Sequence, residues 1–442
     1  MSLVQEIRRG RKRLSYTQDE LAACQEKRFR ELLLHAWDNS PFYRDYYSGR
    51  GVHEADLSDV QLTDLPAVSK ELLMEHFDDV VTDPALHKKS IEEWIQLVKD
   101  PRQFYERKYV VMHTSGTSGN IGVFVYGKPA ANELKAAIFN WAHPVLRPLQ
   151  RTRIAYYAAT HGRFAGVALA ANMPRRVYNV RLFSVLDPTE TVMRQIERFQ
   201  PHQLVGYAST IADLAEKTRD RMISLSPKNI IVSGDPLTEM TRHRIEQTWP
   251  HARLVEIYAA SESIGIAIRR QDEEEMTVLD DLQKIELLDD KNNEVGTGET
   301  GRIVLTNFYN RVMPLIRYEM HDLAVRGSSP TKDSPYSKIR SIQGRLDNPL
   351  PITLDDGKKD EIHPIVLSEF FVPGLEKVQF ASMKPDEVYV RYVADRDLDE
   401  EVKAEFYRLL HHKGAVRSMK AVVQRVDGMK NDEKTGKFHV VT

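Results

Sequence analysis

Residues 113–122, His-Thr-Ser-Gly-Thr-Ser-Gly-Asn-Ile-Gly, carry three glycines at a spacing of three among hydroxyl side chains. Glycine lets a backbone approach a bulky anion and adopt positive φ at little cost. Successive backbone N–H groups, helped by Ser and Thr hydroxyls, can then bind a phosphate. The segment lacks the Gly-Lys-Ser/Thr sequence of a Walker loop, and a strand rather than a helix is predicted to follow it. It therefore predicts either a phosphate-binding loop of another kind or a plain hairpin turn.

Two further polar clusters follow predicted strands. The first is Ser233-Gly234-Asp235-Pro236, where the glycine would let the backbone lie flat against a planar ring. An ordinary strand-to-helix turn explains these four residues equally well. The second is Tyr258-Ala259-Ala260-Ser261-Glu262, in which Tyr258 can stack on a base and the hard oxygens of Glu262 can bind a divalent cation.

Two charged residues nearer the C-terminus are also candidates. Asp322 lies among apolar residues at the head of a predicted strand, where its carboxylate can accept from a ribose diol. A helix cap or a salt bridge to Arg317 is the structural alternative. Lys437, in Lys434-Thr435-Gly436-Lys437, can stabilise negative charge, or it can simply belong to a solvated terminus.

The elements that must position these residues alternate between strand and helix. Apolar, β-rich runs at 153–158, 203–206, 229–233 and 253–258 are interleaved with helical patterns at 189–199, 209–224 and 237–249. This alternation predicts βαβ units and a largely parallel sheet, which binds ligands at the carboxyl ends of its strands.

The first hundred residues read as helices, with a capping box at Thr17–Glu20. After residue 270 the predicted strands 284–288, 301–306 and 323–326 pair locally. A smaller α+β unit follows residue 344, with strands at 377–382, 386–393 and 419–426 and a helix at 397–412.

Size and charge narrow the possible functions. A chain of 442 residues is expected to form two or more domains. The net charge of −2 gives no reason to expect a nucleic-acid partner. The basic cluster at residues 8–13 reads as the solvated start of the first helix. The single cysteine, Cys24, excludes an internal disulfide and a Cys-rich zinc site. With no signal-peptide pattern and no membrane-spanning run, we expect a cytoplasmic protein without a membrane partner.

The order and spacing of these motifs resemble the adenylate-forming superfamily, which comprises acyl-CoA synthetases, adenylation domains and luciferases. The resemblance runs from residue 109 to the end of the chain and is closest to the phenylacetate–CoA ligase-like branch, which includes coenzyme F390 synthetase-like and capsule-cluster relatives. The markers of that branch are Asn39-Ser40-Pro41-Phe42-Tyr43-Arg44, the turn at 233–236 and Pro314-Leu315-Ile316-Arg317-Tyr318.

The resemblance implies a fold and an activity. The fold is α/β, with a large N-terminal domain (1–344) of mainly parallel sheets that binds ATP and acid, and a small mobile C-terminal α+β lid (345–442). The activity is ATP- and Mg²⁺-dependent conversion of a small carboxylic acid to an acyl-adenylate, followed by transfer to CoA. A separate carrier protein or an amine are alternative acceptors. A catalytically silent nucleotide-binding regulator or scaffold is the alternative from another class.

The resemblance also implies roles for residues. The ATP-binding set is Thr114, Ser115, Gly116, Thr117, Ser118, Gly119, Ser233, Gly234, Asp235, Pro236, Tyr258, Ala259, Ser261, Asp322 and Arg345. Glu262 would bind Mg²⁺ and act in catalysis with Lys437, and Asp347 would be the hinge. The acid pocket would be lined by Tyr156, Tyr157, His161, Phe164, Tyr207 and Ala260, whose aromatic rings suggest a flat or aryl acid, although such rings are also typical of a core.

The sequence departs at one important place from the pattern of the superfamily that it resembles. Many relatives carry Pro-Lys-Gly at the end of the ATP loop, where this chain has Asn120-Ile121-Gly122. Without the loop lysine, charge compensation of the departing pyrophosphate would fall to Mg²⁺, backbone amides and Lys128.

Overall fold

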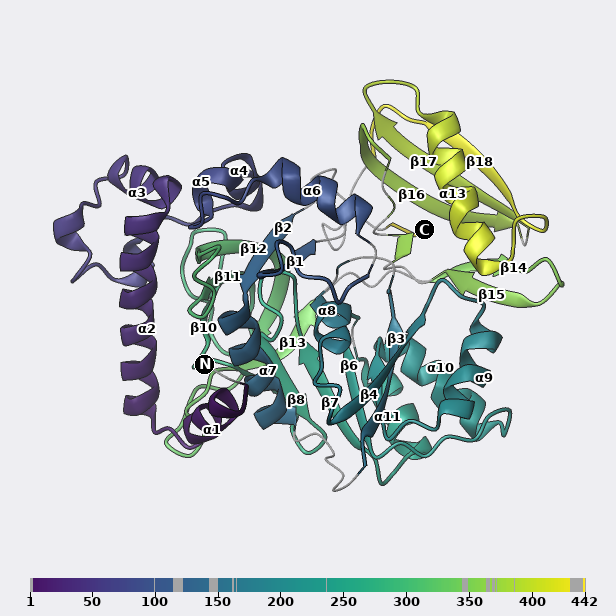
Figure 1. Cartoon of the computed structure of the whole chain (residues 1–442), viewed down its shortest axis with the longest axis horizontal. Helices are drawn as coiled ribbons and strands as arrows, with labels where there is room; N and C mark the ends of the chain where they lie inside the picture. The colour runs from purple at the N-terminus through teal and green to yellow at the C-terminus, as the bar shows by residue number, and fades with distance from the viewer. Residues whose placement is uncertain are drawn as a thin grey trace.

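An eleven-stranded mixed sheet forms the centre of this α/β protein (Figure 1). The computed structural model describes residues 3–441 apart from 99, 114–121, 143–149, 161–162, 164, 236, 344–348, 363–365, 368–369, 371, 385 and 430–439. The order of the strands across the sheet is β10-β11-β12-β13-β9-β8-β7-β6-β5-β3-β4. The α/β fold class predicted from the sequence is confirmed.

Five neighbouring strands of the sheet are parallel, as the alternating pattern predicts. They are β3 (Thr152–Ala158), β4 (Tyr178–Ser184), β5 (Gln203–Gly206), β6 (Asn229–Ser233) and β7 (Arg253–Tyr258). The helices between them are α8 (Ala165–Ala171), α9 (Thr189–Phe199), α10 (Ala208–Arg219) and α11 (Glu239–Thr248). Because the strands are parallel, their carboxyl ends lie at one edge of the sheet, which is where the predicted polar clusters begin.

The other six strands pair antiparallel, in line with the local pairing predicted after residue 270. They are β8 (Ala267–Arg270), β9 (Met276–Val278), β10 (Gln283–Leu288), β11 (Thr300–Asn307), β12 (Leu315–Arg326) and β13 (Lys338–Gln343). β12 is far longer than the predicted strand 323–326. Its register against β11 shifts between the pairs Arg302–Leu323 and Val304–Glu319, so residues 320–322 form a bulge opposite one residue of β11. Bulges re-aim side chains and often lie beside functional sites.

The N-terminal region is helical, as predicted. It contains α1 (Leu3–Arg13), α2 (Gln18–Asn39), α3 (Pro41–Ser48), α4 (Lys70–Glu75), α5 (Phe77–Val80) and α6 (Lys88–Leu97), with 3₁₀ turns at Glu54–Asp56 and Leu62–Asp64. The predicted capping box is present, since the Thr17 hydroxyl accepts from the Glu20 N–H and the Glu20 carboxylate accepts from the Thr17 N–H. The hairpin of β1 (Tyr109–His113) and β2 (Val123–Gly127) follows, and then α7 (Lys128–Ala142).

The C-terminal unit is α+β, with elements close to those predicted. It comprises β14 (Leu350–Thr353), β15 (Lys359–Ile362), β16 (Leu375–Lys384), β17 (Glu387–Ala394), α13 (Asp399–Lys413) and β18 (Lys420–Arg425). Asp360 of β15 accepts from the N–H and hydroxyl of Thr189 at the start of α9, and it pairs with Lys413 at 3.4 Å. The domain boundary at residues 344–345 lies outside the described residues and stays a prediction. In the part of the chain that the structure describes, no helix is long and apolar enough to cross a membrane.

Candidate active site

The ends of the β1–β2 hairpin and of the parallel strands meet at one edge of the sheet. His113 ends β1 and Val123 begins β2, so these two residues flank the segment 114–121. The Ser261 hydroxyl donates to the His113 carbonyl at 3.1 Å, and the Tyr126 hydroxyl donates to the Ser261 carbonyl at 2.6 Å. The segment that follows β7 is thereby held against the entry to the loop.

Tyr258 and Asp322 meet at the same edge, although 64 residues separate them. The Tyr258 hydroxyl donates to Oδ2 of Asp322 at 2.8 Å. Burial, and next the charge of the Asp322 carboxylate, raise the pKa of the Tyr258 phenol well above its usual value, so the phenol stays a donor. Within the described residues, Oδ1 of Asp322 accepts no hydrogen bond, so it is available to a hydroxyl of a ligand.

Arg317 does not pair with Asp322, so the salt bridge considered as an alternative for this carboxylate is wrong. The guanidinium of Arg317 donates to both oxygens of Glu286, at 3.1 and 2.9 Å. It also donates to the Thr63 carbonyl at 2.9 Å and to the Leu65 carbonyl. Arg317 itself adopts a left-handed backbone conformation with φ of 48°. It therefore ties β12 to β10 and to the N-terminal region, away from the Asp322 carboxylate.

Glu262 is almost fully buried, with 8% of its surface exposed. Burial raises the pKa of the Glu262 carboxyl. A hydrogen bond from the backbone N–H of Glu262 and the positive charge of Lys70 both oppose this rise. The Tyr318 hydroxyl donates to Oε1 of Glu262 at 3.3 Å. Lys70 is a residue that the sequence analysis missed. It is buried in the first turn of α4, where the helix dipole disfavours a cation. The sequence alone did not single it out, because only the fold brings its charge to act on Glu262.

The environment of Glu262 fits a magnesium ion that is bound mainly by a nucleotide. Among the described residues, no group of three or more His, Cys, Asp or Glu side chains could hold a metal ion alone. Mg²⁺ in nucleotide-dependent enzymes is usually held by one or two carboxylates together with substrate phosphates and water. Glu262 supplies one such carboxylate, and a bound cation would relieve the cost of keeping it charged while buried.

The turn after β6 combines a glycine in an unusual conformation with a capping carboxylate. Gly234 has φ of +94°, which favours glycine over any other residue. The Asp235 carboxylate accepts from the N–H groups of Ala208 and Ser209, the latter at 3.0 Å, and so caps α10. The Asp235 side chain therefore stabilises the start of α10. A ligand that approaches this turn would contact the backbone of Ser233 and Gly234 instead.

The tyrosines predicted for the acid pocket are all buried but do not share one surface. Tyr156 and Tyr157 are neighbours in β3, so their side chains point to opposite faces of the sheet. Tyr156 packs against α8, where a Cβ on Gly166 would lie 2.5 Å from its hydroxyl oxygen. The Tyr207 hydroxyl accepts from the Ala159 N–H at 3.1 Å. At most one of the two β3 tyrosines can therefore face an acid in a single pocket.

Lys128 lies at the wrong end of the hairpin to replace the missing loop lysine. It follows Gly127, which pairs with Tyr109, whereas the loop joins the opposite end at Val123. Four residues of extended strand separate the two ends of β2, roughly 13 Å. The ammonium of Lys128 lies over the Phe104 ring, 5.4 Å from its centroid.

Several predicted site residues lie outside the described part of the chain and remain predictions. They are Thr114, Ser115, Gly116, Thr117, Ser118, Gly119, His161, Phe164, Pro236, Arg345, Asp347 and Lys437. The described residues that meet at the edge of the sheet are Ser233, Gly234, Tyr258, Ala259, Ala260, Ser261, Glu262 and Asp322.

The chain is similar in sequence and in fold to several known proteins. The chain is 27% identical over 350 residues to phenylacetate-coenzyme A ligase of Aromatoleum evansii, covering 76% of this chain and 73% of the ligase. It is 22% identical over 407 residues to protein CapK of Staphylococcus aureus, covering 86% of this chain and 80% of CapK. The fold is similar to that of a 2-hydroxyisobutyryl-CoA ligase solved with 2-HIB-AMP and CoA, with a TM-score of 0.58 and 18% identity over 95% of this chain and 88% of the ligase.

These similarities confirm the predicted resemblance to the phenylacetate–CoA ligase-like branch of adenylate-forming enzymes. The family described as AMP-binding enzyme matches residues 15–310, which is about two thirds of the chain and includes the β1–β2 hairpin, the turn after β6 and the Glu262 segment. The chain therefore belongs to the AMP-binding enzyme family.

Proposed function

We propose that this protein activates a carboxylic acid with MgATP and transfers the acyl group to CoA. In the first step a carboxylate oxygen attacks the α-phosphorus of ATP, the bond from that phosphorus to the bridging oxygen breaks, and pyrophosphate leaves. In the second step the CoA sulfur attacks the carbonyl carbon of the acyl-adenylate, AMP leaves with the electrons of the C–O bond, and the thiol proton is released. An aryl acid is the first candidate substrate, because relatives are named for phenylacetate.

The observation that carries this proposal is the meeting of three distant segments at one strand edge. The hydrogen bonds from Ser261 to His113 and from Tyr258 to Asp322 bring the loop entry, the segment after β7 and the bulge of β12 together. In this arrangement Asp322 accepts from the ribose, the turn at Gly234 lies against the adenine, and Glu262 holds the magnesium ion. Phosphoryl transfer depends chiefly on positioning and charge stabilisation, and this set of residues supplies both.

We further propose that Lys70 helps to keep the Glu262 carboxylate ionised. Lys70 is 5% exposed, and its charge favours the ionised form of Glu262. A buried ammonium beside the magnesium-binding carboxylate keeps that carboxylate charged while the nucleotide is bound. The positive charge of Lys437 would stabilise the negative charge that develops during the first step on the attacking carboxylate and the bridging oxygen.

A panel of acids tests the proposal by pyrophosphate release with and without CoA. The panel contains phenylacetate, benzoate, a short aliphatic acid and a dicarboxylate, and mass spectrometry follows the products. We expect acid-dependent pyrophosphate release and an acyl-CoA product. An acyl-adenylate that accumulates without forming a thioester would redirect the acceptor to a carrier protein or an amine. ATP binding without pyrophosphate release for any acid would favour the silent nucleotide-binding regulator.

A further inference from the structure

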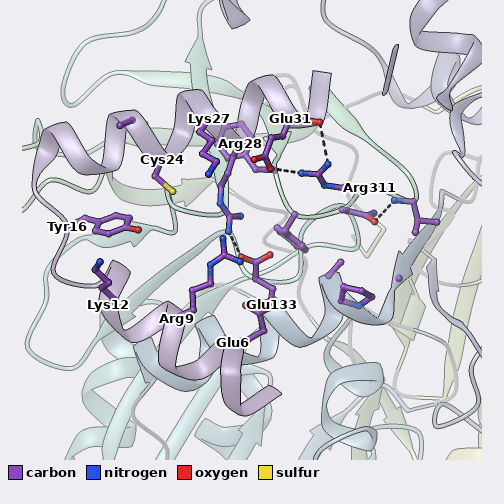
Figure 2. Close-up of a pocket in the computed structure, with 18 of the residues that line it drawn as sticks. Glu6, Arg9, Lys12, Tyr16, Cys24, Lys27, Arg28, Glu31, Glu133 and Arg311 are labelled. Carbon is purple, nitrogen blue, oxygen red and sulfur yellow. Dashed lines mark hydrogen bonds and ion pairs between the residues drawn. The ribbon is translucent and has the colours of Figure 1, made fainter. Parts of the chain in front are cut away.

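A second cavity lies between α1, α2, the start of α7 and the segment 308–312 (Figure 2). Its volume is about 670 Å³, within the range of about 300–1,000 Å³ that is usual for small-molecule sites. Among the residues that the structure describes, none of those predicted for ATP or acid binding lines it. The cavity is therefore separate from the strand edge that carries the proposed active site.

The wall of this cavity contains two cations that the protein has already neutralised. Arg28 of α2 pairs with Glu133 of α7, and Arg311 pairs with Glu31 of α2 at 2.7 Å (Figure 2). These ion pairs fix the positions of α2, α7 and the segment 308–312 relative to one another.

Three further cations line the cavity and are available to a ligand. Arg9 and Lys12 lie three residues apart on α1, and Lys27 lies on α2. All three are exposed, and within the described residues their side chains take part in no hydrogen bond or ion pair. Positions three apart on a helix share one face, so Arg9 and Lys12 can act on the same group. The basic cluster at residues 8–13 is therefore divided, because Arg8 and Arg11 do not line the cavity.

Glu6 adds a buried acceptor to the same wall. Only 4% of its surface is exposed, and its Oε2 has no hydrogen-bond partner in the part of the chain that the structure describes. This oxygen has almost no accessible surface, so a ligand in the cavity does not contact it directly. The carboxylates of Glu6 and Glu20 belong to the same wall as the free cations, and the cavity therefore offers cations for a polyanion on the side of Arg9, Lys12 and Lys27.

We propose that this cavity is a second ligand site, which binds a phosphorylated metabolite of nucleotide size through Arg9, Lys12 and Lys27. Phosphate groups match guanidinium and ammonium donors. The occupant would also contact a wall that is shared with the active site. Tyr309 lines the cavity, and its hydroxyl lies 3.1 Å from that of Ser263, the neighbour of Glu262.

Cys24 gives a local test of this proposal that does not depend on catalysis. It is the single cysteine of the chain, it is partly exposed, and it lines the cavity. We would measure its rate of alkylation by iodoacetamide with intact-mass spectrometry, in the presence of inorganic tripolyphosphate, ADP or neither. We expect both compounds to slow alkylation. Stronger protection by ADP would identify a nucleotide as the ligand, and equal protection would identify the phosphate chain as the recognised group.

A matched pair of double variants provides the control. Arg9→Ala/Lys12→Ala and Arg8→Ala/Arg11→Ala remove the same charge from the same helix, but only the first pair lines the cavity. We expect the first variant to weaken protection by about tenfold or more and the second to behave like the wild type. Isothermal titration of tripolyphosphate into the three proteins measures the same difference without the thiol. Equal protection and equal affinity in both variants, or no protection in the wild type, would overturn the proposal.

Discussion

Replacing Asp322 by alanine is expected to weaken ATP binding by about 1.5–3 kcal/mol, because the variant loses hydrogen bonds from the ribose to a charged acceptor. This is roughly a ten- to hundredfold loss of affinity. In the structure Oδ2 of Asp322 accepts from Tyr258 at 2.8 Å and Oδ1 has no partner among the described residues. If only Oδ1 receives a ribose hydroxyl, the loss will lie near the lower end of this range.

The variant Tyr258→Phe separates the orientation of Asp322 from its charge. It keeps the ring that can stack on a base and removes only the hydroxyl that holds the carboxylate. We expect a loss of affinity of about 1 kcal/mol, typical of one hydrogen bond. The control ligand is 2′,3′-dideoxy-ATP, which has no hydroxyl to donate, so Asp322→Ala should hardly change its binding.

Isothermal titration of each protein with ATP and with the dideoxy analogue measures these differences. Thermal unfolding of the same proteins reports whether the substitution acts through stability. An Asp322→Ala protein that loses affinity equally for both nucleotides would refute the assignment of this carboxylate to the ribose.

Three further predictions concern catalysis, transfer and stability. Lys437→Ala should abolish acyl-adenylate formation but leave ATP affinity nearly intact, because its charge matters only where charge develops; near-normal pyrophosphate release would remove it from the mechanism. Asp347→Pro should permit adenylation and stop transfer to CoA, since proline fixes φ; equal loss of both half-reactions would argue against a hinge there. Burial, and next the charge of Glu361, raise the pKa of Asp213 from 3.8 to about 7. The folded state therefore binds a proton that the unfolded state releases, and the free energy of unfolding should fall by on the order of 1–2 kcal/mol as the pH rises from about 4 to 7. Urea unfolding at pH 5 and pH 8 should show this fall in the wild type but not in Asp213→Asn, and an identical pH dependence in the two proteins would contradict it.

The elements of the parallel half were predictable because each has a local signal. β5, β6 and β7 are apolar, β-rich runs bounded by turn residues, and they occupy the predicted positions. The predicted helix 209–224 is too long because α10 ends at Arg219 and Arg221 adopts φ of 59°. The local pattern does not mark that end. A left-handed residue after a helix is usually glycine or asparagine, and arginine at residue 221 therefore gave no sign of it.

The features that the sequence did not predict depend on contacts between distant residues. β12 begins at Leu315 because Arg317 is stabilised by Glu286, 31 residues away, in a conformation that would otherwise interrupt a strand. Asp235 caps a helix that begins 27 residues before it, so its position after a strand suggested a ligand contact that its carboxylate does not need. Lys70 became a candidate only once the fold placed its charge near Glu262.

The central claim, that the enzyme joins a carboxylate oxygen to the α-phosphorus of ATP, is tested most directly by oxygen transfer. The accepted acid is labelled with ¹⁸O in its carboxyl group, incubated with the enzyme, MgATP and CoA, and the released AMP is analysed by mass spectrometry. The account predicts that each AMP carries one ¹⁸O atom, because the thiol displaces AMP by breaking the bond between the carbonyl carbon and that oxygen. AMP without the label, formed together with acyl-CoA, would show that no acyl-adenylate lies on the path and would contradict the account.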